Sequence, residues 1–224
     1  MKNIFAWVSS SLALFAAAQA GAQLPPADPP QGKIDLTTQA PAPPVTRSYR
    51  LHDGFYTRAS MGFGPIGASL DDGDPSGRDL EGSGTAFGFD LMIGGSPSPG
   101  VAIGGALLVQ AAVSADVDRG GGTPSDDRNF SSLIIGPFID GFPMANKGFH
   151  LGGTLGLAAL DFEGGGGDTA GFGGAAWVGY DFWVAEEWSV GPLFRLGGTL
   201  TTNDDDDLDA SSMSALFLFT ALYH

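Results

Sequence analysis

Residues 87–94 read FGFDLMIG, and their side chains alternate between two kinds with a period of two. Successive side chains of a β-strand point to opposite faces, so this period predicts a strand with two different faces. The large apolar face consists of Phe87, Phe89, Leu91 and Ile93. The opposite face consists of Gly88, Asp90, Met92 and Gly94. The two faces are therefore expected to meet different surroundings.

The same theme recurs through residues 53–224. Eight apolar segments of about 10–16 residues are too rich in glycine and too alternating for helices. They span 54–68, 85–95, 101–115, 130–142, 149–160, 172–184, 189–199 and 212–223. Short breaks at 96–100, 143–148 and 185–187 take turns with longer ones at 70–84, 116–129, 161–171 and 201–210. This order predicts an all-β fold, an eight-stranded antiparallel up-and-down barrel with tight turns at one end and long loops at the other.

The surroundings of the two faces decide between two kinds of barrel. A soluble, lipocalin-like carrier would turn the large face inward and would need many charged side chains on the wet outer face. The eight segments contain neither Lys nor Glu. A transmembrane barrel turns the large face to lipid and keeps charges inside, because an outward Arg near the midplane costs about 2–4 kcal/mol. We therefore predict a transmembrane β-barrel, with the lipocalin-like carrier as the alternative.

Most of the net charge of −15 falls in the predicted long loops. The loop acids include Asp71, Asp72, Asp74, Asp126, Asp127, Asp168, Asp204, Asp205, Asp206 and Asp207. Such an acidic chain is not expected to bind nucleic acid, which requires Lys and Arg for its phosphates. The absence of cysteine excludes disulfides, thiolate metal sites and cysteine nucleophiles. The acids are expected to be simply solvated, with weak binding of divalent cations as the alternative.

Four charged residues fall on the small-residue face, at similar depth in the half of the barrel near the short turns. They are Arg58, Asp90, Asp181 and Arg195. An eight-stranded barrel is only wide enough for its own side chains to fill it. We expect the four to cross-pair as a structural plug, with Trp177 and Trp183 helping to close the lumen. The alternative is an ion path with a charged constriction. Polar residues expected in the lumen or at its rim are Gln110, Asp140 and His150.

The N-terminal segment has the features of an export signal. Lys2 precedes an apolar stretch at 4–18, and Ala18-Gln19-Ala20 fits a small-x-small cleavage site. We expect residues 1–22 to be a cleaved secretory signal peptide rather than a membrane anchor. Residues 23–52 are rich in proline and are expected to form an extended linker, or alternatively a ligand for a periplasmic partner.

Several features together resemble one group of proteins: the signal peptide, HDGFY at 52–56, the eight segments and the amphipathic end FLFTALYH at 217–224. The chain resembles the small eight-stranded outer-membrane β-barrels of Gram-negative bacteria, the OmpA transmembrane-domain and OmpX-like group. The resemblance implies an outer-membrane barrel with its linker in the periplasm and its acidic loops outside the cell. It also implies contact with outer-membrane lipid and lipopolysaccharide, whose phosphates divalent cations could bridge to the loops. Assembly machinery is thought to read a terminal aromatic residue in such barrels, and here Tyr223 is penultimate.

Some barrels of this kind are lipid-modifying enzymes that use histidine at the membrane edge. This chain has three histidines, His52, His150 and His224, and all are expected near the short-turn end, away from the long loops. We therefore expect no catalytic residues, metal site or cofactor. The predicted function is a non-enzymatic barrel with a packed lumen and a structural or surface-interaction role. The alternatives are a narrow pore for ions or small solutes and, less favoured, a lipid-modifying enzyme.

Overall fold

A computed structural model describes residues 50–71, 80–118, 128–162, 168–203 and 208–224. The strands are β1 (Gly54–Asp71), β2 (Leu80–Ser98), β3 (Val101–Asp118), β4 (Arg128–Gly141), β5 (Phe149–Phe162), β6 (Asp168–Tyr180), β7 (Phe182–Trp183), β8 (Trp188–Asn203) and β9 (Leu208–Tyr223). Within these ranges no helix is long and apolar enough to cross a membrane. The expected signal peptide at 1–22 and most of the linker at 23–52 lie outside the described residues. So do the expected loop acids Asp72, Asp74, Asp126, Asp127, Asp204, Asp205, Asp206 and Asp207.

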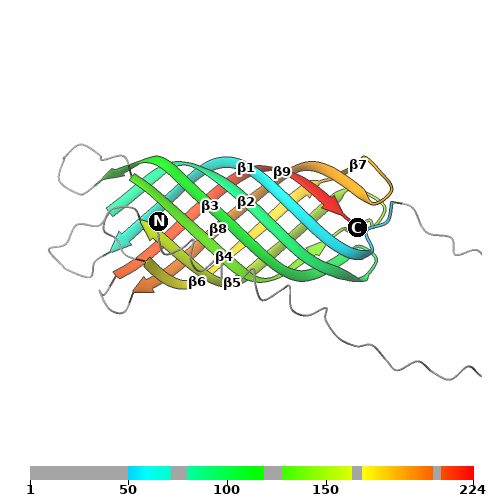
Figure 1. The fold of residues 1–224 in the computed structure, drawn as a ribbon, viewed down its shortest axis with the longest axis horizontal. Coiled ribbons are helices and arrows are strands. Elements are labelled where there is room, and N and C mark those ends of the chain that lie inside the picture. The colour runs from blue at the N-terminus through cyan, green and yellow to red at the C-terminus, as the bar shows by residue number, and fades with distance from the viewer. Residues whose placement is uncertain (1–49, 72–79, 119–127, 163–167, 204–207) are drawn as a thin grey trace, which may run out of the picture. The chain divides into compact units, whose positions relative to one another are not determined.

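The strands close into a single antiparallel barrel (Figure 1). Consecutive strands pair from β1 to β6, and β1 also pairs with β9, which pairs with β8. Both β6 and β7 pair with β8, so they are two parts of one strand that is interrupted at Asp181. The barrel therefore has eight strands around its wall, which confirms the predicted architecture. Closure leaves no open sheet edge, as a membrane requires.

Several strands extend further toward the long-loop end than the sequence pattern predicts. β2 begins at Leu80 rather than at residue 85, and β8 continues to Asn203 rather than to residue 199. The ladder persists past the apolar alternation because backbone pairing does not require apolar side chains. Asp71 and Asp168 therefore belong to strands and not to loops, and Glu81 lies within β2. In the backbone register at this end, Glu81 pairs with Asp118, Asp161 with Asp168, and Asp71 with Asp209.

The outer wall carries the large apolar side chains, as predicted. Phe63, Phe87, Phe172 and Met213 each expose more than 60% of their surface. Soluble monomers rarely expose a contiguous apolar surface of this kind, whereas lipid covers it favourably. The fold is therefore a transmembrane barrel, and the lipocalin-like choice of faces is wrong.

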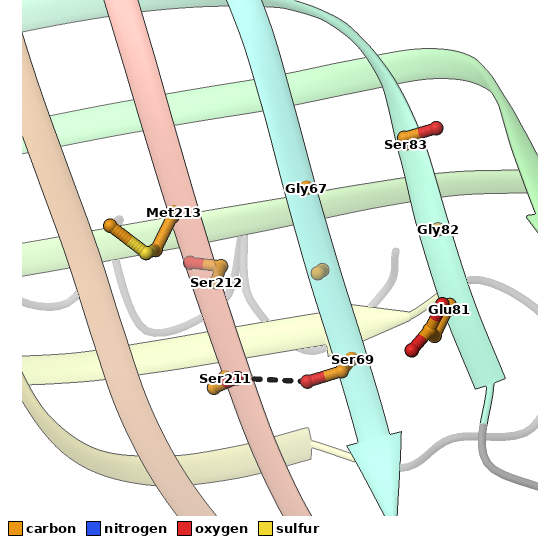
Figure 2. Close-up of a pocket in the computed structure, with 9 residues that line it drawn as sticks. Gly67, Ser69, Glu81, Gly82, Ser83, Ser211, Ser212 and Met213 are labelled. Carbon is orange, nitrogen blue, oxygen red and sulfur yellow. Dashed lines mark hydrogen bonds between the residues drawn. The ribbon is translucent and has the colours of Figure 1, made fainter.

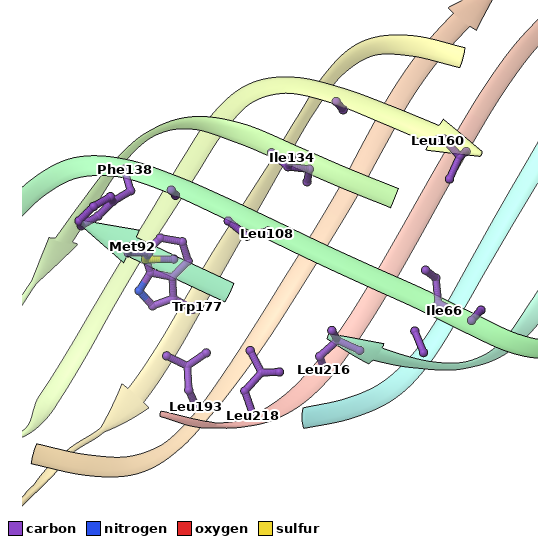
Figure 3. Close-up of a cluster of buried hydrophobic side chains, with 14 of the residues drawn as sticks. Ile66, Met92, Leu108, Ile134, Phe138, Leu160, Trp177, Leu193, Leu216 and Leu218 are labelled. Carbon is purple, nitrogen blue, oxygen red and sulfur yellow. The ribbon is translucent and has the colours of Figure 1, made fainter. Parts of the chain in front are cut away.

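The lumen is more apolar than the sequence analysis expected. A cluster of buried apolar side chains packs inside the barrel, and Figure 3 shows Leu108, Phe138, Leu160, Leu216 and Leu218 among its members. Glycines on the inward face provide the room that these groups need. At Gly152, for example, a side chain would collide with the indole ring of Trp177. The inner face is therefore a packed core that also contains charged groups.

Candidate functional site

Asp140 on β4 is the shared acceptor of a buried hydrogen-bond network in the half of the lumen near the short turns. Tyr56 Oη donates to its Oδ2 at 2.6 Å, and Arg58 Nη1 donates to the same oxygen at 2.8 Å. Trp177 Nε1 donates to Oδ1 at 3.1 Å, and His150 Nδ1 lies 3.2 Å from both oxygens. All five side chains are almost completely buried. Tyr56 and Arg58 reach Asp140 together because they are two residues apart on the inward face of β1.

Arg58 has two further contacts across the lumen. Its Nη2 lies 2.9 Å from the Sδ of Met92, and its guanidinium carbon lies 4.5 Å from the ring centroid of Trp177. A desolvated guanidinium over an indole face is attracted by the ring's negative π-face. The side chain extends from β1 and contacts residues of β2, β4 and β6, which fixes it across the lumen.

A second network crosses the lumen from β8. Arg195 Nη1 pairs with Asp90 Oδ1 on β2, and its Nη2 donates to Gln110 Oε1 on β3 at 2.9 Å. Ser214 Oγ on β9 donates to the same Gln110 oxygen at 2.9 Å. The three charged or amide groups are buried. Gln110 therefore links the ion pair to two further parts of the wall.

The pairing differs from the expected quartet. Arg195 does pair with Asp90, but the carboxylate partner of Arg58 is Asp140, and Asp181 lies 3.5 Å from His150 Nε2. Residues that lie equally far along their strands from the short turns need not lie at the same depth in the lumen, because strands in a barrel are tilted and staggered. Asp181 is also displaced by its position in the break between β6 and β7. The predicted single cluster is therefore two networks, one around Asp140 and one around Arg195.

The short-turn end is closed by an aromatic floor. His52 Nδ1 lies 3.2 Å from His224 Nδ1, and His224 Nε2 lies 3.2 Å from Ser189 Oγ. The His52 ring stacks on Phe142 with centroids 3.7 Å apart, and Trp183 contacts both imidazoles. Burial, together with neighbouring histidines, lowers the pKa of His52 to about 3 and that of His224 to about 4. Neutral rings suit this contact, because one Nδ1 must accept the proton that the other donates.

Ser189, His224 and His52 form a hydrogen-bonded chain with the spacing of a nucleophile, a base and an orienting group. Sequence reasoning missed this chain, since His52 and His224 are 172 positions apart and no local pattern connects them. Ser189 is completely buried within the floor. The hydroxyl group of Ser189 therefore lies inside the floor and has no contact with solvent.

The buried charged groups pair with one another, but some of their polar atoms have no hydrogen-bond partner. Two arginines face Asp90, Asp140 and Asp181 in the described part of the lumen, and His150 lies between Asp140 and Asp181. Among the described residues, Arg58 Nε, Arg195 Nε and both Asp181 oxygens have no hydrogen-bond partner. The described residues contain no group of three or more His, Asp or Glu placed to hold a metal ion.

Comparison with known proteins gives similarities of fold. No protein-family model matches the chain, and no curated protein matches it. The outer-membrane protein OprG of Pseudomonas aeruginosa is 13% identical, with a TM-score of 0.48 over 79% of this chain and 99% of that one. Neisserial surface protein A is 16% identical, with a TM-score of 0.46 over 76% and 97%. The outer-membrane protease OmpT of Escherichia coli is 10% identical, with a TM-score of 0.40 over 77% and 97%. The architecture given above rests on the strand pairing itself.

Proposed function

We propose that this protein is a non-enzymatic outer-membrane barrel that is closed by its own side chains and acts through the surface that it displays. The observation that carries the proposal is the complete burial of Arg58 and Arg195, each paired with a carboxylate from another part of the wall. Two such cross-links at different places in the lumen, embedded in an apolar core, support a barrel that is closed to water and ions. Similarity to OprG and Neisserial surface protein A is compatible with an outer-membrane location.

The long-loop end is the proposed interaction surface. Acidic residues occupy its strand ends, among them Glu81 and Asp209, whose side chains are exposed. In the proposed orientation this end faces outward, beside lipopolysaccharide, and the linker at 23–52 lies in the periplasm. Divalent cations would bind here weakly, screening the acids and bridging them to neighbouring lipid phosphates.

The test is conductance in planar lipid bilayers. The wild-type protein is expected to give no resolved channel steps, because the paired arginines fill the lumen. Arg195→Ala removes a cross-lumen link and is expected to produce discrete steps, whereas Asp209→Asn, at an exposed strand end, is the matched control and stays silent. A heat-dependent gel shift of each purified variant shows that it has folded into the barrel. Steps from folded wild-type protein would contradict the proposal.

A narrow pore is the second candidate, and the unpartnered polar atoms favour it. The unpartnered polar atoms of Arg58, Arg195 and Asp181 could bind a row of water molecules through the packed region. On this alternative, the folded wild-type barrel conducts, and Asp181→Asn changes its cation selectivity. A lipid-modifying enzyme would instead alter lipid A when the protein is overexpressed, and the proposal expects lipid A to be unchanged.

A further inference from the structure

A hollow of about 420 Å³ lies in the barrel wall where β2, β1 and β9 approach the long-loop end (Figure 2). Gly67 lines it without a side chain, and the buried residues Ala68, Gly82 and Ser212 line it from the wall behind. Around them stand Ser69, Glu81, Ser83, Ser211 and Met213. These flanking residues have odd numbers, as do the lipid-facing residues Phe63, Phe87 and Phe217 on the same strands. The hollow therefore opens on the outer surface of the barrel and not into the lumen.

The height of the hollow places it at the edge of the apolar band. Met213 at its lower side exposes 78% of its surface, and Phe87 lies four positions along β2 from Ser83. On its upper side are Glu81 and Asp209, which are both exposed and occupy outward positions of strand ends. A membrane that covers the apolar band therefore ends at the level of the hydroxyl groups. On the membrane placement proposed above, lipid headgroups lie at the depth of the hollow.

The polar groups that line the hollow favour a sugar headgroup over a phosphate headgroup. Ser69 and Ser211 are joined by a 2.8 Å hydrogen bond, which leaves further acceptor capacity on both oxygens. Glu81 supplies a carboxylate, and the described lining contains no Lys or Arg that would hold a phosphate. Hydroxyl groups that both donate and accept match this set, because they can donate to Glu81 and exchange hydrogen bonds with Ser83 and Ser69. A volume of this size is in the range of small-molecule sites.

We infer that this hollow binds the sugar ring of a glycolipid from the membrane leaflet at the long-loop end. The lipid's acyl chains then lie against Met213 and the aromatic residues below it. The inference rests on the membrane placement proposed above and adds a ligand class and a site to it.

Two glycine variants test the site with little strain. An added Cβ at Gly67 meets only the backbone oxygen of Gly82, at 3.8 Å, so the backbone at this position accepts a side chain, and Gly67→Leu is expected to fill the hollow. The matched control is Gly105→Leu on β3, an exposed, outward-facing position where an added Cβ has nothing within 4 Å. Full-length protein is reconstituted in phosphatidylcholine vesicles that contain equal minor fractions of monoglucosyl diacylglycerol and phosphatidylethanolamine. Native mass spectrometry then measures which lipids stay bound to the released protein.

The wild-type protein and Gly105→Leu are expected to retain the glucolipid about five-fold above its bulk fraction, the effect of roughly one net hydrogen bond. Gly67→Leu is expected to retain it at the bulk fraction, and Glu81→Gln to fall between. Bulk retention by the wild type, equal enrichment of phosphatidylethanolamine, or equal loss in both glycine variants would overturn the inference. A gel shift on the same vesicles distinguishes a failure of the sugar site from a failure of the proposed function. A barrel that inserts without enrichment refutes only the sugar site, whereas one that fails to insert refutes both the site and the proposed function.

Discussion

Asp140 is the residue on which the network near the short turns depends. It accepts hydrogen bonds from Tyr56, Arg58 and Trp177 and faces His150. Asp140→Asn keeps the shape but leaves the buried Arg58 without a countercharge. We expect the free energy of unfolding to fall by about 3–5 kcal/mol, the usual cost of breaking a buried ion pair. Urea unfolding in vesicles, followed by tryptophan fluorescence, measures this change.

Two comparisons make the Asp140 test specific. Asp209→Asn changes an exposed acid and should alter the free energy of unfolding by no more than about 0.5 kcal/mol. The double variant Arg58→Met with Asp140→Leu removes both charges. It should be more stable than Arg58→Met alone or Asp140→Leu alone. If its loss instead equals the sum of the two single losses, Arg58 and Asp140 are not partners.

The histidines of the floor predict a dependence on pH. Burial holds the pKa of His52 at about 3 and that of His224 at about 4, below the ordinary value of 6.5. The folded state thus prefers neutral rings, so their contribution to stability is complete above about pH 6.5 and is lost as the pH falls toward the lower values. His52→Phe keeps the stacking on Phe142 but does not titrate. The variant should lose less free energy of unfolding than the wild type between about pH 7 and about pH 4.5. Identical losses in urea titrations at the two pH values would show that His52 is not held neutral.

The sequence predicted which residues face the lumen better than it predicted their partners. Alternation placed Arg58, Asp90, Gln110, Asp140 and Arg195 on the inward face, where the structure has them. Partner choice depends on tilt and stagger between strands, which no local pattern encodes. Tyr56 was missed as a ligand of Asp140, although its position two residues before Arg58 on the same face was a usable signal.

At the scale of elements, the break between β6 and β7 is held by a close backbone contact. Asp181 N donates to Gly148 O at 2.9 Å, and a side chain at Gly148 would collide with the backbone of Asp181. Gly148→Ala therefore has to displace the break, and with it the carboxylate that faces His150. We expect it to lower the free energy of unfolding by about 1–3 kcal/mol in the same urea assay.

The control for this element is Gly105→Ala, where an added methyl group meets open space. It should leave the free energy of unfolding nearly unchanged. Equal stability of Gly148→Ala and wild type would mean that the contact between Gly148 and Asp181 does not hold the break.

Strand existence and order were predictable, whereas strand ends were not. Apolar alternation marks the part of each strand that faces lipid, so segments such as 85–95 lie inside the longer β2. Beyond that band the ladder continues through residues such as Glu81 and Ser83, whose side chains give no periodic signal. The interruption at Asp181 was missed for a similar reason, since Tyr180 and Phe182 continue the outward apolar face on either side of it.

At the scale of the whole molecule, the two faces of one wall differ in composition. The outward face is apolar, as contact with lipid requires, and the inward face combines apolar packing with paired charges. The sequence indicated the first property directly. It understated the second, because Leu216, Leu218 and Leu222 share the inward face of β9 with polar residues and weaken the contrast between faces.

Site-directed labelling of β2 shows which face of the barrel wall meets lipid. The chain contains no cysteine, so single cysteines can replace Phe87, Phe89 and Ile93 on one face and Ala86 and Met92 on the other. Each is labelled with an environment-sensitive fluorophore in vesicles and is exposed to brominated lipid or to aqueous iodide. Brominated lipid is expected to quench the three odd positions, and neither reagent is expected to quench the two even positions strongly. Quenching of the odd positions by iodide, with no effect of brominated lipid, would contradict this expectation.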